Sequence, residues 1–120
     1  MPTKFGDFIA EKRKDRGISL RGMADELKIA APYLSDIEKG RRNPPNFEML
    51  EKIASILKLT ETERNLIFDL AGEDRKEISP DLPEYIMDIP KARTALRKAR
   101  DKGKSAEFWT EINQKLDEDE

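Results

Sequence analysis

The stretch "SLRGMADELKIAAPYLSDIEKGRRNPPNF", which runs from Ser19 to Phe47, predicts two short helices joined by a tight turn. Ser19 can cap the first helix with its side chain. Pro32 suits the first turn of the second helix, because its missing N–H is not needed there. Gly40 is typical of a helix end, and the two prolines that follow exclude a continued helix. The stretch therefore predicts helix, turn, helix and basic loop in that order.

Apolar residues recur at helical spacing on both sides of this stretch, and the alternation typical of strands is missing. One helix is expected over about residues 4–16, a fourth over 47–59 and a fifth over 61–72. Thr60 and Glu63 form the sequence pattern of a capping box before the fifth helix. Its expected inward residues are Leu66, Ile67 and Leu70. The first 72 residues therefore predict a compact all-α domain of five short helices.

The composition changes after Gly72. The segment "EDRKEISPDLPEY" is polar and holds two prolines, so it predicts an extended linker that ends in a short helical turn near residues 85–87. Pro90 can open a further helix, and Ser105 can cap a last one. We therefore expect two parts, a domain over residues 1–72 and a linker with a helical tail over residues 73–120.

Composition excludes several classes of function. The chain of 120 residues has no cysteine and no histidine, which removes disulfides, thiol nucleophiles, histidine bases and nearly all zinc or haem sites. No apolar run approaches the roughly 20 residues that a membrane span needs, and no signal-peptide core is present. Glu61 and Glu63 are typical first-turn helix acids. We expect a soluble, cytoplasmic protein that is not an enzyme, with no catalytic residue, metal or cofactor.

The order of helix, Glu38, Gly40, basic loop, prolines and Phe47 resembles the helix-turn-helix of lambdoid phage repressors and XRE-type bacterial regulators. The likeness covers about residues 5–72. It implies a five-helix phage-repressor-like domain in which an arginine of the first helix, here Arg13, pairs with Glu38. The family commonly has glycine where this chain has Lys28. The turn therefore either carries strain of about 1 kcal/mol or has a different shape.

The resemblance implies that the helix over about residues 31–39 enters the major groove of DNA. Ala31 and Pro32 have no side-chain donor or acceptor, so they are limited to apolar contact, for example with a thymine methyl group. Tyr33 can reach a base or a phosphate with its hydroxyl, or it can pack with that hydroxyl exposed. Asp36 can accept from a cytosine amino group, although a carboxylate beside phosphates is electrostatically unfavourable.

The basic loop and its flanks are expected to supply affinity. Contacts to the phosphate backbone release counterions, so they are independent of sequence and weaken steeply with salt. Any single cation here can instead be a solvated surface charge. The residues assigned to this role are Arg21, Lys39, Arg41, Arg42, Asn43 and Asn46.

The resemblance implies a sequence-specific, double-stranded DNA-binding transcriptional regulator. A single small module with so few base contacts binds weakly, so we expect a repressor that acts as a homodimer on half-sites about 34 Å apart. The alternative is an antitoxin or interaction protein. In that case the C-terminal helices bind a partner protein, and DNA binding serves autoregulation.

The tail carries its own resemblance and its own alternatives. The segments "SPDLPEYI" and "ALRKARDKG" resemble tails of regulators of mobile elements, some of them encoded beside metallopeptidases that inactivate such repressors. The basic run over residues 91–104 can contact DNA or pair with the acidic C-terminus. An apolar stripe needs either the protein's own core or another chain, such as a second copy, a toxin or an inactivating peptidase. The stripe consists of Phe108, Trp109, Ile112 and Leu116.

Overall fold

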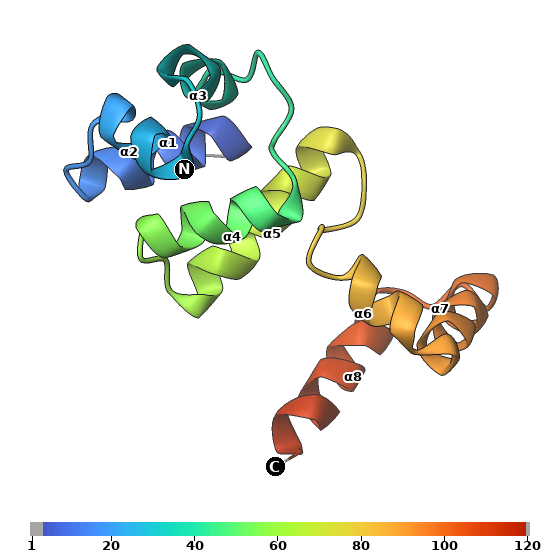
Figure 1. Cartoon of the computed structure of the whole chain (residues 1–120). Helices are drawn as coiled ribbons and strands as arrows, with labels where there is room; N and C mark the ends of the chain where they lie inside the picture. The colour runs from blue at the N-terminus through green and yellow to red at the C-terminus, as the bar shows by residue number, and fades with distance from the viewer. Residues whose placement is uncertain (1–3, 120) are drawn as a thin grey trace. The chain divides into compact units, whose positions relative to one another are not determined.

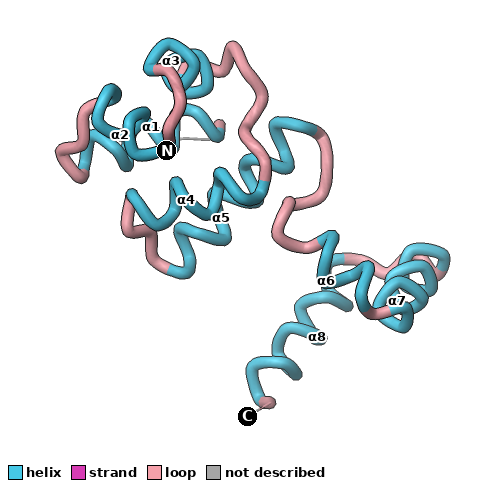
Figure 2. Tube along the Cα trace, viewed as in Figure 1, coloured by secondary structure: helices cyan, strands magenta, loops and turns pink. Residues whose placement is uncertain are grey.

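The computed structural model describes residues 4–119, and all regular elements in that range are α-helices (Figures 1 and 2). The expected all-α class is confirmed. The chain divides into two compact units between Pro83 and Glu84. The elements in order are α1 (Phe5–Asp15), α2 (Leu20–Leu27), α3 (Ala31–Glu38), α4 (Phe47–Ile56), α5 (Glu61–Arg75), α6 (Pro83–Asp88), α7 (Pro90–Asp101) and α8 (Ala106–Glu118).

Helices α1 to α5 enclose one apolar core. Helix α3 contacts α1 and α2, while α5 contacts α1 and α4. Phe47 at the start of α4 stacks on Phe68 of α5, with ring centroids 5.5 Å apart. Burial of each large side chain contributes about 1.5–3 kcal/mol, so this cluster is the main source of the unit's stability. The largest fully buried side chains are Phe5, Ile9, Met23, Leu34, Ile37, Leu50, Ile53, Leu57, Ile67 and Phe68.

Helix α3 is placed by two close helix crossings. Ala24 of α2 is buried in the core, where a small side chain lets α2 and α3 approach. Gly6 of α1 lies against the end of α3, because a Cβ atom at this position would come within 2.6 Å of the Ile37 carbonyl oxygen. A side chain larger than hydrogen at Gly6 would therefore push α1 and α3 apart.

The turn between α2 and α3 keeps a left-handed shape despite its lysine. Lys28 has φ 60° and ψ 41°, and its N–H bonds back to the carbonyls of Ala24 and Asp25. The Ile29 N–H also reaches the Ala24 oxygen at 3.0 Å. The turn thus has the form that glycine commonly provides, and of the two alternatives for Lys28 the strained one holds.

Helix α5 runs past Gly72 to Arg75, further than the sequence predicts. Gly72 is not a stop, since it allows the following segment to pass close by: a Cβ atom there would lie 2.8 Å from the Glu77 carbonyl oxygen. The helix ends at Lys76, which has φ 59°. The expected inward position of Leu66 is wrong, because Phe68 takes a place on the inward face and leaves Leu66 38% exposed.

Helices α6 to α8 bury little of their own surface. Among residues 84–119, Ala99 is the one hydrophobic residue that is buried. Phe108 and Trp109 lie edge to face with ring centroids 5.0 Å apart. Arg93 of α7 donates to the Met87 carbonyl oxygen at the end of α6 at 2.8 Å. None of the helices within residues 4–119 is long and apolar enough to cross a membrane.

Candidate nucleic-acid interface

The C-terminal end of α3 is held by an almost fully buried ion pair. Arg13 of α1 donates from Nε and Nη2 to the two carboxylate oxygens of Glu38, at 2.8 and 3.0 Å. Its Nη1 donates to the Ile18 carbonyl oxygen at 2.9 Å. The two side chains are only 10% and 9% exposed, and the hydrogen bonds with Glu38 raise the pKa of Arg13. The ion pair that the family resemblance implies is present. It fixes α3 against α1 and against the turn before α2.

The exposed part of α3 offers few polar groups for base contacts. Pro32 in the first turn is exposed, whereas Ala31 and Tyr33 are half-buried against the core. Asp36 lies 3.7 Å from the guanidinium of Arg41 in an exposed ion pair. This pairing lowers the cost of a carboxylate near phosphates, but it also occupies the one acid that was assigned to base contact.

The loop between α3 and α4 is exposed at its cations and anchored at its prolines. Arg41, Arg42 and Asn43 are exposed, while Pro44 is buried. The guanidinium of Arg42 lies over the ring of Tyr33, with 5.5 Å from Cζ to the ring centroid. Such a contact holds a cation in place without neutralising it. The loop therefore presents its positive charge in a restrained geometry.

Asn46 has a structural task in addition to the one expected from the sequence. Its Oδ1 accepts from the Met49 N–H at 3.0 Å and so caps α4. The amide nitrogen of Asn46 has two donors, which remain available for an acceptor outside the chain. The cap fixes the orientation in which those donors are presented.

Four of the predicted DNA-contacting residues line a single hollow of about 370 Å³, which we call the loop hollow. Arg75, at the end of α5, also lines it. The Nε and Nη2 atoms of Arg75 donate to the Pro44 carbonyl oxygen at 3.1 and 2.8 Å, so α5 clamps the loop. The residues that line the loop hollow are Tyr33, Arg42, Asn43, Pro44, Pro45, Asn46, Met49 and Arg75.

The other predicted contact residues lie outside the loop hollow. Arg21 is exposed in the first turn of α2, and Lys39 is exposed as the C-cap of α3. Arg41 is turned toward Asp36. The sequence pattern does not indicate Arg75 at this site, because it predicts that the helix carrying Arg75 ends at Gly72. The one local feature that marks Arg75 is that it is a basic residue in the last turn of a helix.

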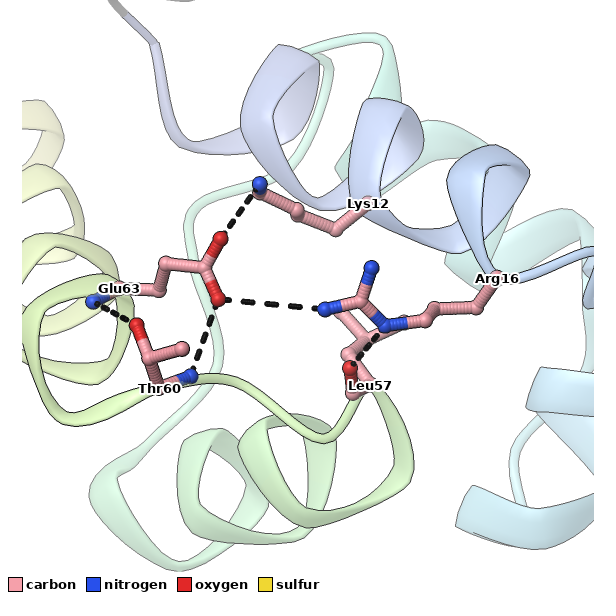
Figure 3. Close-up of polar contacts among 5 residues, drawn as sticks. All are labelled: Lys12, Arg16, Leu57, Thr60 and Glu63. Carbon is pink, nitrogen blue, oxygen red and sulfur yellow. Dashed lines mark hydrogen bonds and ion pairs between the residues drawn. The ribbon is translucent and has the colours of Figure 1, made fainter.

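A second polar cluster joins α1 to the turn between α4 and α5 (Figure 3). The Glu63 carboxylate lies 2.6 Å from Lys12 Nζ and accepts from the Thr60 N–H at 3.0 Å. Arg16 donates from Nε to the Leu57 carbonyl oxygen at 3.0 Å. Hydrogen bonds from Lys12 and from the Thr60 backbone lower the pKa of Glu63 to about 2. This carboxylate is therefore ionised at neutral pH and serves the fold, as the predicted capping box implies.

Known proteins resemble this chain over the segment that holds α2, α3 and the loop. The family described as Helix-turn-helix matches residues 9–64, which include α2, α3 and the loop. The ImmF control region 10 kDa protein of Bacillus phage phi105 is 35% identical over 79 residues, which cover 60% of this chain and 83% of that protein. The chain belongs to the XRE-type helix-turn-helix family.

Other relatives of this XRE-type chain are similar over the same domain. The HTH-type transcriptional regulator DdrOP3 of Deinococcus deserti is 40% identical over 57 residues, 48% of this chain and 43% of that protein. SinR of Bacillus subtilis is 36% identical over 52 residues, 43% of this chain and 47% of SinR. The chain thus matches less than half the length of these two relatives. A solved SinR protein/SinI protein complex is similar over 97% of this chain, with a TM-score of 0.45 and 24% identity.

Proposed function

We propose that this XRE-type protein is a cytoplasmic, sequence-specific DNA-binding repressor that occupies promoter DNA as a homodimer. The observation that carries the proposal is the Arg13–Glu38 pair, which fixes the end of α3 beside a loop with exposed cations. A helix presented in this way can enter the major groove while the loop lies against the phosphate backbone. The protein acts by binding and not by catalysis.

Affinity and specificity come from different residues in this proposal. Arg21, Lys39, Arg41, Arg42, Asn43 and Asn46 supply phosphate contacts, which are independent of sequence. Ala31 and Pro32 fit the groove by shape and by contact with methyl groups. Tyr33 lies under Arg42, and Asp36 is paired with Arg41, so direct readout by α3 is modest. Half-site spacing and DNA deformability carry much of the specificity.

The test is a titration of the full chain against the DNA upstream of its own gene and against a random duplex, at 0.05 and 0.2 M salt. Arg42→Ala should weaken binding to both duplexes and reduce the dependence on salt. Tyr33→Ala should change the ratio between the two affinities. Lys52→Ala is the matched control, because it removes the same charge from a surface lined by Glu26, Glu48 and Glu51. No preference for the upstream DNA at low salt would overturn the proposal.

A second function, that of an antitoxin or interaction protein, is supported by the exposed apolar side chains of the C-terminal unit. Tyr85, Met87 and Leu116 are each more than 60% exposed, and Trp109 is 38% exposed. These side chains are available to a partner. In a homodimer the partner is a second copy, and in an antitoxin it is another protein, such as a toxin or a repressor-inactivating peptidase. Light scattering distinguishes them: twice the chain mass of 13.8 kDa supports the homodimer. A stoichiometric complex with a second polypeptide would support the interaction protein.

A further inference from the structure

We propose that Arg75 is a DNA-contacting residue, and that it forms with Arg42 a site for one phosphate of the DNA backbone. The inference rests on the proposed function and adds to it a residue that lies outside the segment matched by the Helix-turn-helix family, which ends at residue 64. The site is the loop hollow, and its walls come from α3, the following loop, α4 and the last turn of α5.

Arg75 is restrained in a way that leaves donors free. Two of its N–H groups are used on the Pro44 carbonyl oxygen, at 3.1 and 2.8 Å. A guanidinium has five N–H donors, so about three remain for an external acceptor. Arg75 is exposed, so these donors are accessible to a ligand. The Pro44 contact orients the guanidinium before a ligand arrives, which reduces the entropy lost on binding.

The loop hollow has the charge that a phosphate requires. The described residues that line it include the guanidinium groups of Arg42 and Arg75, the amides of Asn43 and Asn46, and no carboxylate. Like charges around one hollow repel each other, and a bound anion relieves that repulsion. Arginine is also suited to bidentate contact with phosphate.

Two other hollows of the same unit lack this character. The hollow between the start of α1 and the end of α3 is lined by Asp7, Glu38 and Asp74 as well as by cations. The one beside α2 and α4 is lined by three glutamates and one lysine. A phosphate is therefore favoured in the loop hollow and opposed by carboxylates in these two.

The last turn of α5 is anchored on both sides of Arg75. The Asp74 carboxylate accepts from the Phe5 N–H at 3.3 Å, which joins this turn to the start of α1. The segment after the helix packs closely over Gly72, and Ser79 hydrogen-bonds to Asp69. These contacts fix the position from which Arg75 reaches Pro44. The cation is thus part of the rigid unit that carries α3.

The source of the phosphate follows from the neighbours of the site. Arg42, Asn43 and Asn46 belong to the loop proposed to lie on the DNA backbone, and the loop hollow is continuous with it. A duplex phosphate held by that loop comes within reach of Arg75. Free inorganic phosphate offers the same chemistry, so the experiment must separate the two.

The experiment measures duplex affinity against salt for the full chain and for Arg75→Gln, Arg75→Lys, Arg42→Gln and the Arg42→Gln, Arg75→Gln pair. Arg75→Gln should weaken binding to specific and random DNA about tenfold at 0.1 M salt and reduce the slope of log K against log salt by about 0.9. Arg75→Lys should retain most of the slope, because it retains the charge. Lys52→Gln, which removes an equal charge elsewhere, should leave the affinity within about twofold.

A duplex with single neutral methylphosphonates then locates the contact. Methylphosphonates at the contacted phosphates should each weaken the wild-type protein. At one position the further loss should be smaller for Arg75→Gln and absent for the Arg42→Gln, Arg75→Gln pair. An unchanged slope with an unchanged methylphosphonate pattern would overturn the proposal, since Arg75 would then act only through Pro44. Displacement of the duplex by millimolar inorganic phosphate, at constant ionic strength, would also overturn it in favour of a free-anion site. If the wild-type chain binds no duplex, the proposed function fails first and the inference falls with it.

Discussion

Helices α1 to α5 and helices α6 to α8 have similar amphipathic patterns but differ in what they bury. Apolar residues of α1 to α5 converge on one core, whereas Tyr85, Met87 and Leu116 remain exposed in the second unit. Helical spacing thus predicts which face of a helix is apolar, but not what covers that face. Helices α1 to α5 cover one another's apolar faces, whereas the three helices of the C-terminal unit leave large apolar side chains exposed.

The largest expected effect separates the two units directly. Phe68 is 2% exposed and stacks on Phe47, so Phe68→Ala should lower the free energy of unfolding by about 3–5 kcal/mol. Leu116→Ala should change the unfolding of the first unit by less than about 0.5 kcal/mol, because Leu116 is 62% exposed. Urea denaturation followed by circular dichroism measures both. Equal losses would show that the two units unfold as one and would remove the contrast.

The next effect concerns the ion pair that holds α3. Glu38→Gln should destabilise the protein by about 3 kcal/mol, because it leaves the almost fully buried Arg13 guanidinium without its counter-charge. Glu51→Gln is the matched control, because it breaks an ion pair that is exposed. The Arg64 side chain is 37% exposed and the Glu51 side chain is 44% exposed. The control should cost less than about 1 kcal/mol. Similar midpoints in urea for the two variants would mean that the Arg13–Glu38 pair does not anchor α3.

A smaller effect depends on pH. The pKa of Glu63 is about 2 in the folded protein against an ordinary 4.5, so its contribution to stability is present above about pH 4.5 and is lost as pH falls toward 2. Because the side chain is 23% exposed, solvent screening reduces this contribution to about 1 kcal/mol.

Thermal unfolding at pH 6 and pH 3 tests the contribution of Glu63. The wild-type chain should lose more stability over this interval than Glu63→Gln, which has no carboxylate to protonate. In the second unit, by contrast, the Arg100–Asp101 pair joins adjacent, exposed residues. Asp101→Asn should therefore change Tm less than Glu63→Gln does at pH 6, and the reverse order would contradict the assignment.

Local sequence features predicted most of the fold. The Ser19 cap, the Thr60 and Glu63 capping box and the helix order are confirmed, because each depends on residues close together in the chain. The end of α5 was missed. Glycine is needed at position 72 because the segment after the helix passes close to it. In the sequence pattern this residue looks only like a glycine typical of a helix end.

The predicted site residues could be placed on elements but not paired from the sequence. Tyr33 and Arg42 belong to different segments, and their contact depends on how the loop folds back over α3. The same is true of Asp36 and Arg41. Arg75 is 31 residues from Pro44, so the contact depends on the packing of the whole unit and has no local signature.

The smallest effect compares the helix ends of the two units. Lys28 adopts φ 60° after α2, whereas Gly103 supplies the left-handed residue after α7 with φ 66°. Lys28→Gly should remove strain of about 1 kcal/mol, and the greater freedom of glycine in the unfolded chain should offset part of that gain. We expect a net gain of about 0.5 kcal/mol, measurable as a small rise in Tm. A fall in Tm would show that the lysine side chain contributes more than its backbone strain costs, so the turn before α3 would be held by side-chain contacts as well as by its shape.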